Sequence, residues 1–235
     1  MKRVFPFALA AVCLSLHAAD SSPKASVTSA IKSLSDQPNY SWKTTVEVPE
    51  DSRFRPGPTE GKTEKSGLTY LVMHFGDNAT DVVLKGKKGA ISREGEGWQS
   101  LSELEDSQGP MRFFAILIRN FKAPAAEARQ LVSCTKETKQ TEPGVYSGDL
   151  TADGVKNLVT WHRPGGGEGP EVSNPSGSVK FWLKDGALTK YQFKVKGTMD
   201  FNGNDFDLDR TTTVEIKDVG TTKLTVPEAA KSKMS

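Results

Sequence analysis

The chain has 235 residues and a formal net charge of +2 at pH 7, and 36% of its residues are hydrophobic. Lys2 and Arg3 account for both net positive charges, so the remainder is close to neutral and lacks the basic excess expected of a nucleic-acid-binding protein. Cys13 and Cys134 are the two cysteines, and neither forms a CxxC motif or a cluster with histidine, so no metal-site pattern is present.

The first nineteen residues have the three parts of a cleavable export signal. Two basic residues are followed by the almost wholly apolar segment 4–16, and Ala18 and Ala19 precede a polar run. The apolar segment is shorter than the ~20 residues that a membrane-spanning helix needs. We therefore expect a signal peptide over residues 1–19, cleaved after Ala18 or Ala19, and no transmembrane span.

The position of Cys13 argues against a lipid anchor. It follows Val12 within the apolar segment, whereas a lipidated cysteine follows a small residue. The expected mature domain, residues 20–235, then keeps only Cys134, which we predict in the last turn of a helix, facing a core. We expect this domain to be periplasmic or secreted.

The exported part is predicted to open with a helix and to continue with strands. Val27, Ala30, Ile31 and Leu34 recur at helical spacing, which predicts a helix over residues 26–34. Alternation of apolar and polar residues, or short apolar runs, then predict strands. These strands are expected at 40–48, 61–65, 68–75, 81–84 and 90–93.

The middle of the chain is predicted to be helical. Residues 110–121 have a broad apolar surface, and a second helix is expected to begin at Pro124, where the missing N–H of proline costs nothing. Thr151 is a suitable N-cap for a third, short helix. The first two helices need an apolar surface to cover.

Strands return in the last third of the chain. After a strand at 145–150 and a Gly- and Pro-rich loop at 165–175, amphipathic strands are predicted at 178–184, 188–196 and 210–218. Asp185-Gly186 and Asn202-Gly203 are tight-turn pairs, which predicts antiparallel neighbours.

The expected fold class is α+β, with a single antiparallel sheet built from both ends of the chain. One face of this sheet is apolar and covered by the opening and central helices, and the other is charged and exposed to water. Trp182, among lysines on the charged face, is the exception.

The order of these elements resembles the LolA-like periplasmic lipoprotein-carrier superfamily, whose relatives include mycobacterial lipid-binding lipoproteins. The residues that carry the resemblance are Tyr-Ser-Trp at 40–42, the Lys-Asp-Gly turn that ends 179–186, and Leu-x-Lys-Tyr at 188–191. The resemblance spans most of residues 24–227 in the order of elements. It implies a curved sheet, an incomplete barrel whose concave apolar face is covered by helices and holds acyl chains or another apolar ligand.

Aromatic and aliphatic side chains on the predicted helices and strands are candidates for the lining of such a cavity, although an ordinary packed core would contain the same residues. A lid is expected from Phe113, Phe114 and Leu117. A floor is expected from Tyr40, Trp42, Tyr70, Phe181, Tyr191 and Phe193.

Catalytic patterns are not found in the sequence. Outside the signal there are two histidines, His74 and His162, and there is no Gly-x-Ser-x-Gly motif. The Gly-rich residues 165–169 lack the Lys-Ser/Thr of a phosphate-binding loop. The acidic segment 200–209 begins like a calcium loop, but a solvated hairpin tip is favoured and calcium binding stays open.

The sequence therefore predicts an exported, non-catalytic carrier or binding protein for lipid, lipoprotein acyl chains or another apolar ligand. No cofactor or metal is expected. Expected partners are a lipid or a lipidated protein, with membrane-associated donor or acceptor proteins, and not nucleic acid. The alternative is an exported structural or protein-interaction domain with a filled core and no ligand.

Overall fold

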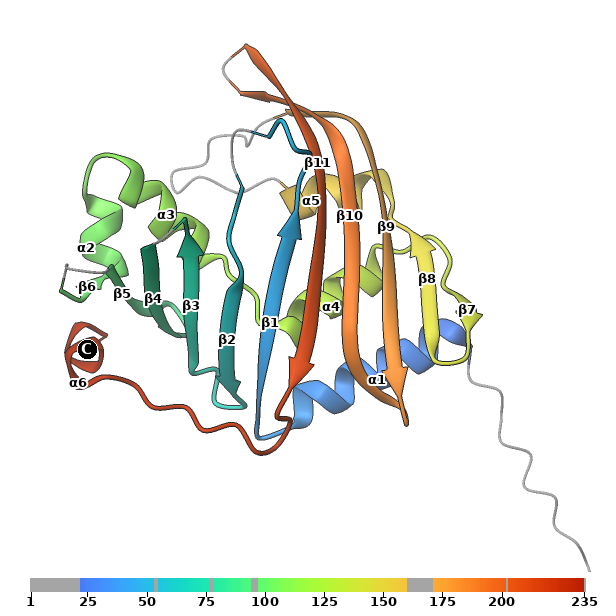
Figure 1. Ribbon diagram of the computed structural model, residues 1–235, viewed down its shortest axis with the longest axis horizontal. Coiled ribbons are helices and arrows are strands. Elements are labelled where there is room, and N and C mark those ends of the chain that lie inside the picture. The colour runs from blue at the N-terminus through green and yellow to red at the C-terminus, as the bar shows by residue number, and fades with distance from the viewer. Residues whose placement is uncertain are drawn as a thin grey trace, which may run out of the picture.

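The computed structural model describes residues 22–52, 55–76, 78–93, 97–159, 171–201 and 203–234. In these residues, eleven strands form one sheet in the order β6-β5-β4-β3-β2-β1-β11-β10-β9-β8-β7 (Figure 1). The strands are β1 (Asn39–Glu47), β2 (Thr59–Glu64), β3 (Thr69–Phe75), β4 (Asn78–Lys85), β5 (Lys88–Arg93), β6 (Gln99–Ser100), β7 (Lys139–Glu142), β8 (Val145–Asp149), β9 (Glu171–Lys184), β10 (Ala187–Phe201) and β11 (Asn204–Lys217). The helices are α1 (Pro23–Asp36), α2 (Leu101–Asp106), α3 (Pro110–Arg119), α4 (Pro124–Ser133), α5 (Ala152–Val159) and α6 (Glu228–Lys233).

The two ends of the chain meet inside this sheet. Strand β1 pairs with β11 in antiparallel register, with Thr44 opposite Val214, and every other neighbouring pair in the sheet is also antiparallel. Because the order of strands starts at β6 and ends at β7, the sheet is open and does not close into a barrel. The α+β class and the single antiparallel sheet are therefore confirmed.

Helices cover one face of the sheet, as predicted from its alternating strands. In Figure 1, α1 and α4 cross behind β1, β11, β10 and β9, while α2 and α3 lie at the end that carries β5. The apolar residues of α1 are buried, and so are Tyr191, Phe193 and Val195, which alternate with lysines along β10. Thr151 caps α5 as expected, since its hydroxyl accepts a hydrogen bond from the backbone N–H of Gly154 at 3.0 Å.

The loop predicted at 165–175 is wrong for residues 171–175, because β9 already begins at Glu171. A β-bulge explains how a proline is accommodated there. Asn174 and Pro175 lie between two register pairs and oppose the single residue Gly197 on β10. A bulged residue needs no ladder hydrogen bond, so the missing N–H of Pro175 is tolerated within the strand.

The outer face of the sheet is not exposed to water along its whole length, which corrects the sequence prediction. Val83 on β4 and Ala90 on β5 point outward and form a small buried cluster with Val226 and Ala230. The segment after β11 runs back along the molecule and ends in α6, which contacts β5 (Figure 1). The C-terminal segment therefore shields the outer face near this end of the sheet.

Helix α2 was not predicted from the sequence, although its start carries a recognisable signal. The Ser100 hydroxyl accepts from the backbone N–H of Glu103, and the Glu103 carboxylate accepts from the backbone N–H of Ser100. This reciprocal capping box satisfies two N–H groups that the first helical turn leaves free. The Ser-x-x-Glu spacing at 100–103 is visible in the sequence.

Gly61 leaves the space that the indole of Trp42 fills. The two residues face each other across β1 and β2, and Trp42 is buried. A Cβ atom added at Gly61 would lie 2.1 Å from Cζ2 of Trp42, far inside van der Waals contact. The absence of a side chain on β2 therefore determines how deeply this tryptophan packs.

We expect Gly61→Ala to lower the free energy of unfolding by about 1–3 kcal/mol, because the methyl group clashes with the indole of Trp42 and forces it to shift. Urea unfolding monitored by tryptophan fluorescence measures the effect. The neighbouring substitution Lys62→Ala, at an exposed position of the same strand, is the control and should change stability by less than about 0.5 kcal/mol. Equal stability of the two variants would contradict the packing described here.

Candidate ligand cavity between the helices and the sheet

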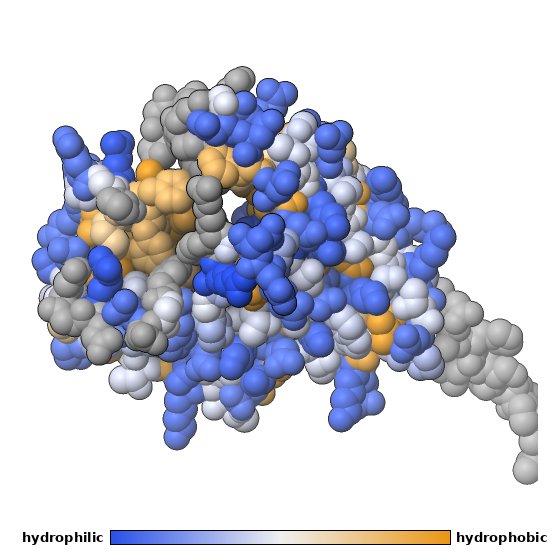
Figure 2. Space-filling view, turned by 45° about the horizontal axis from the view of Figure 1, so that its top comes forward, coloured by the Kyte–Doolittle hydropathy of each residue, from blue (hydrophilic) through white to orange (hydrophobic). Residues whose placement is uncertain are grey.

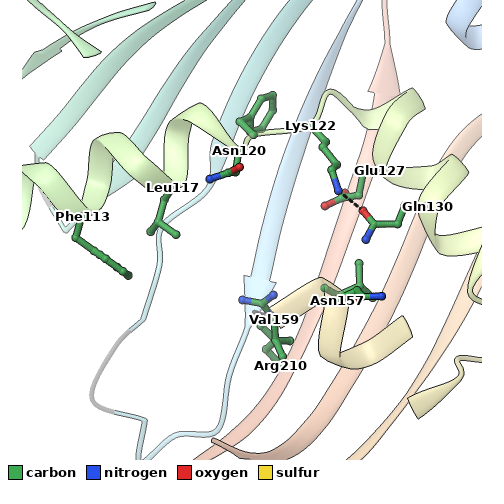
Figure 3. A pocket seen from close by; sticks show the side chains of 11 residues that line it. Phe113, Leu117, Asn120, Lys122, Glu127, Gln130, Asn157, Val159 and Arg210 are labelled. Carbon is green, nitrogen blue, oxygen red and sulfur yellow. Dashed lines mark hydrogen bonds between the residues drawn. The ribbon is translucent and has the colours of Figure 1, made fainter. Parts of the chain in front are cut away.

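A cavity of about 720 Å³ lies between α3, α4 and α5 on one side and β11 on the other. Figure 2 shows apolar side chains gathered in a hollow on the surface that faces the viewer. Figure 3 shows the side chains around the cavity, which come from the three helices, from the segment between α3 and α4, and from the strand. The residues that line it are Phe113, Leu117, Asn120, Phe121, Lys122, Glu127, Gln130, Asn157, Leu158, Val159 and Arg210.

The apolar wall on α3 follows from the helical repeat. Phe113 and Leu117 are four residues apart, so they lie on one face of the helix and point into the cavity (Figure 3). Their neighbours Ala115 and Ile118 are buried against the core. Phe113 and Leu117 stay 44% and 39% exposed, which is uncommon for large apolar side chains and leaves an apolar surface accessible from the cavity.

The carboxyl group of Glu127 has a defined partner in the sheet. Helix α4 is held at its start by Tyr40, whose hydroxyl accepts a hydrogen bond from the backbone N–H of Ala125 at 3.2 Å. Two residues later, in the same turn of the helix, the Tyr191 hydroxyl donates to Oε2 of Glu127 at 2.6 Å. Burial raises the pKa of Glu127, and this is partly offset by the bond from Tyr191 and by the charges of Arg210 and Lys122.

Arg210 lies on the sheet side of the cavity. Unlike the carboxyl group of Glu127, its side chain has no hydrogen-bond or ion-pair partner among the described residues. Its Nε atom is buried and has no hydrogen-bond acceptor among the described residues. Burial lowers the pKa of its guanidinium, and the charge of Glu127 partly offsets this. Arginine nevertheless stays protonated in proteins, so Arg210 brings a positive charge into a space lined by both apolar and polar side chains. Figure 3 shows it beside Val159, across the cavity from Lys122 and Glu127.

A second, smaller cavity of about 100 Å³ lies next to the first, with Phe121, Lys122 and Glu127 in both linings. It reaches the sheet at Trp42 and Tyr191. The rings of Trp42 and Phe121 are stacked with their centroids 6.2 Å apart. The aromatic floor of the smaller cavity therefore continues directly into the lining of the larger one.

The structure brings four of the nine predicted cavity residues to these spaces. Phe113 and Leu117 line the larger cavity, and Trp42 and Tyr191 line the smaller one. Phe114, on the other side of α3, is half-buried against the core. The core also holds three buried residues that line neither cavity, namely Tyr40, Phe181 and Phe193.

Tyr70 lies away from all of these residues, on the opposite face of the sheet. It packs against the small outer cluster of Val83 and Ala90, and its hydroxyl donates to Oδ1 of Asp81 at 2.9 Å. Burial and this carboxylate raise the pKa of Tyr70 to about 12. Tyr70 is therefore separated from the cavity by the sheet itself.

The polar residues of the cavity were missed by sequence reasoning. Arg210 could have been found from the sequence, because it lies an even number of residues before Thr212, Val214 and Ile216. Side chains at these positions point to the same face of β11, which is the face toward the helices. A charged residue at such a position indicates a cation on the covered face. Glu127 has no comparable signal, because an acidic residue in a first helical turn is favoured there for its interaction with the helix dipole.

Other features considered in the sequence contribute no site. His74 is half-buried on β3, while His162 and the Gly-rich residues 165–169 lie outside the described residues. In the acidic hairpin, the backbone N–H of Gly203 donates to Asp200, and Asp209 pairs with Lys194 and Lys196. The described residues contain no group of three His, Cys, Asp or Glu side chains placed to hold a metal ion. They also contain no helix long and apolar enough to cross a membrane.

The sequence matches no protein-family model and no curated protein. Solved structures with a related arrangement include lipoprotein LppX from Mycobacterium tuberculosis, 12% identical with a TM-score of 0.47, covering 86% of this chain and 97% of that one. LprF from Mycobacterium bovis is 14% identical with a TM-score of 0.47, covering 88% and 97%. A LolA superfamily protein from Nitrosomonas europaea is 8% identical with a TM-score of 0.35, covering 87% and 96%. The likeness to these structures concerns the fold alone.

Proposed function

We propose that this protein is an exported, non-catalytic carrier or binding protein for lipid, lipoprotein acyl chains or another apolar ligand. The observation that carries the proposal is the cavity between the helices and the sheet. Its volume of about 720 Å³ lies within the roughly 300–1,000 Å³ typical of small-molecule sites. Export is supported by the signal-like residues 1–19, which lie outside the described part of the chain.

The energetics of chain burial are sufficient for such a role. Each buried methylene group contributes about 0.8 kcal/mol, so ten methylenes contribute roughly 8 kcal/mol before the cost of ordering the chain. A gross term of that size is comparable to the binding free energy of a micromolar complex. The exposed parts of the Phe113 ring and the Leu117 side chain offer the apolar contact that an acyl chain needs.

The alternative, an interaction domain with a filled core, is less favoured by the geometry. A filled core would not need a cavity of this size with two large apolar side chains on its wall. On the outer face, Trp182 is half-buried, and Nζ of Lys190 lies 4.7 Å from the centre of its ring. The ring of Trp182 therefore already has a cation–π partner within the protein.

Native mass spectrometry of the protein purified from its own host, followed by organic extraction, tests the proposal directly. We expect an excess mass that disappears on extraction and is recovered as one or a few lipids. If the protein carries no excess mass and takes up no acyl chain when the chain is supplied, the proposal fails.

We further expect the double substitution Phe113→Ser and Leu117→Ser to weaken binding of a neutral acyl probe, such as a monoacylglycerol, by about tenfold or more. The reason is that both changes remove apolar contact from the cavity wall, where each side chain contributes on the order of 1 kcal/mol. Calorimetric titration below the critical micelle concentration measures the loss.

Val219→Ser is the matched control, since Val219 is an exposed apolar residue that does not line the large cavity. Its affinity for the probe should equal that of the wild type. Thermal unfolding should also change less in the double variant than in a variant of a fully buried residue, because Phe113 and Leu117 are partly exposed. An unchanged affinity in that variant would show that the probe binds elsewhere.

A further inference from the structure

We propose that the cavity selects amphiphiles with an anionic head group, and that Arg210 is the residue that binds this head. The inference deepens the proposed function and rests on it. Two ligand sources share the required chemistry, namely a fatty-acid carboxylate and the phosphate of a lysophospholipid. Both place an oxyanion at one end of an acyl chain.

The first argument is the unmet hydrogen-bonding capacity of Arg210. Its Nε–H is buried without an acceptor, and no ion pair within 4.0 Å joins its guanidinium to any described residue. A buried donor left without an acceptor costs about 1–3 kcal/mol, and more when it is charged. Polar groups of this kind are paired in nearly all native structures, and none of the described residues pairs with this Nε–H, so the oxyanion of a ligand is a suitable acceptor for it.

The second argument is the charge around the cavity. Among the described residues that line it, Lys122 and Arg210 are basic and Glu127 is acidic, which leaves an excess of one positive charge when all three are ionised. The only carboxyl group in this set already accepts a hydrogen bond from Tyr191. Burial favours its neutral form, which increases the positive excess further. An anion is the ligand that this arrangement stabilises.

The third argument is the division of the cavity into an apolar and a charged part. Phe113 and Leu117 line it on α3, whereas Arg210 lies beside Val159 on the side of β11 (Figure 3). An amphiphile can therefore place its chain along α3 and its head at the guanidinium. The planar fork of arginine donates two parallel hydrogen bonds to a carboxylate or a phosphate, a geometry that lysine does not provide.

The experiment titrates the delipidated full chain with three palmitoyl ligands below their critical micelle concentrations: palmitate, lysophosphatidic acid and the neutral monoacylglycerol. We expect the wild type to bind at least one of the two acids about tenfold or more tightly than the neutral ligand, because a charge-assisted hydrogen bond contributes enough for that ratio. Comparison of palmitate with lysophosphatidic acid distinguishes the two sources of the head group.

Substitution of Arg210 then tests the assignment. Arg210→Met should abolish the preference for acids, whereas Arg210→Lys should restore part of the preference. Arg129→Met is the control, since Arg129 is an exposed arginine on α4 that bonds to Ser35 and does not line the cavity. Arg210→Gln provides a second variant if the methionine variant does not fold.

The outcomes separate the two proposals. Equal affinity of the wild type for acidic and neutral ligands overturns the head-group inference and leaves the carrier function intact. Loss of the preference in Lys122→Met but not in the Arg210 variants overturns the assignment to Arg210. Failure of all three ligands to bind any form of the protein overturns the proposed function itself.

Discussion

Truncation of Phe181 to alanine is expected to lower the free energy of unfolding by about 3–5 kcal/mol, the largest stability loss that we predict for this protein. The side chain is fully buried, lies opposite Tyr191 in the β9–β10 pair, and has its ring centre 6.4 Å from that of the tyrosine. Removal of the ring leaves a space inside a packed core. Urea unfolding followed by far-ultraviolet circular dichroism measures the change.

The adjacent Trp182 provides the matched control. Because side chains alternate along β9, Trp182 points to the outer face, where it is only half-buried beneath Lys190. Trp182→Ala should cost about 1 kcal/mol or less, chiefly through the lost cation–π contact. A similar loss for both variants would contradict the assignment of the two faces of the sheet.

The same pair of variants separates core residues from cavity residues. Phe181 was predicted to line a ligand cavity, yet it borders neither space. Phe181→Ala should therefore keep its affinity for an acyl probe under conditions in which the variant stays folded, in contrast to the double change at Phe113 and Leu117. Weaker binding by folded Phe181→Ala would instead extend the ligand site toward β9.

Replacement of Glu127 by glutamine is expected to make stability less sensitive to pH. Burial raises the pKa of Glu127 above its ordinary value of 4.5, so the folded protein binds this proton more tightly than the unfolded chain does. The stability that binding of this proton contributes is fully present below pH 4.5. It is lost as pH rises through the pKa that Glu127 has in the folded protein. Within that window the loss approaches about 1.4 kcal/mol per pH unit.

Urea unfolding of the wild type and Glu127→Gln at several pH values between 4 and 8 measures the effect. Glutamine keeps an oxygen that can accept the hydrogen bond from Tyr191 but cannot ionise. The stability of the wild type should therefore fall relative to that of the variant as pH rises. A difference that is constant across the range would contradict the buried state of this carboxyl group.

Glu103→Gln is a control of opposite sign. The backbone N–H of Ser100 and then the Lys233 ammonium hold the pKa of Glu103 below its ordinary value. The stability contributed by its charge is therefore present above pH 4.5 and is lost as pH falls through the folded pKa. A titration of Glu103→Gln extended below pH 4.5 should therefore show the stability of the wild type falling relative to this variant as pH falls, the opposite direction from Glu127→Gln.

Local patterns in the sequence were sufficient to predict much of the fold. Alternation along β10 separates Tyr191 and Phe193 from Lys190, Gln192 and Lys194, and this determines which side of the strand is covered. The pair Asp185-Gly186 adopts positive φ at both positions, as the two-residue turn between β9 and β10 requires. These features depend on neighbouring residues alone, so a single sequence contains them.

Tyr70 shows where local patterns stop being informative. The strand that contains it has apolar residues at both parities, so alternation does not tell which side faces the helices. Its pairing with β2 and β4 decides this, by placing Leu71 with the core and Tyr70 with the outer cluster. A shift of β3 by one residue against its neighbours would have placed Tyr70 with the core and Leu71 on the outer face.

The sequence by itself thus determined the α+β class, the single antiparallel sheet and the apolar surfaces of α3 and β10. Only the tertiary structure decided which of those surfaces pack and which border a cavity. It also placed Glu127 and Arg210 at one cavity, although they come from a helix and a strand far apart in the chain. The physical reason is that propensity and periodicity act over a few residues, whereas a cavity and its charges arise where distant elements fail to fill the space between them.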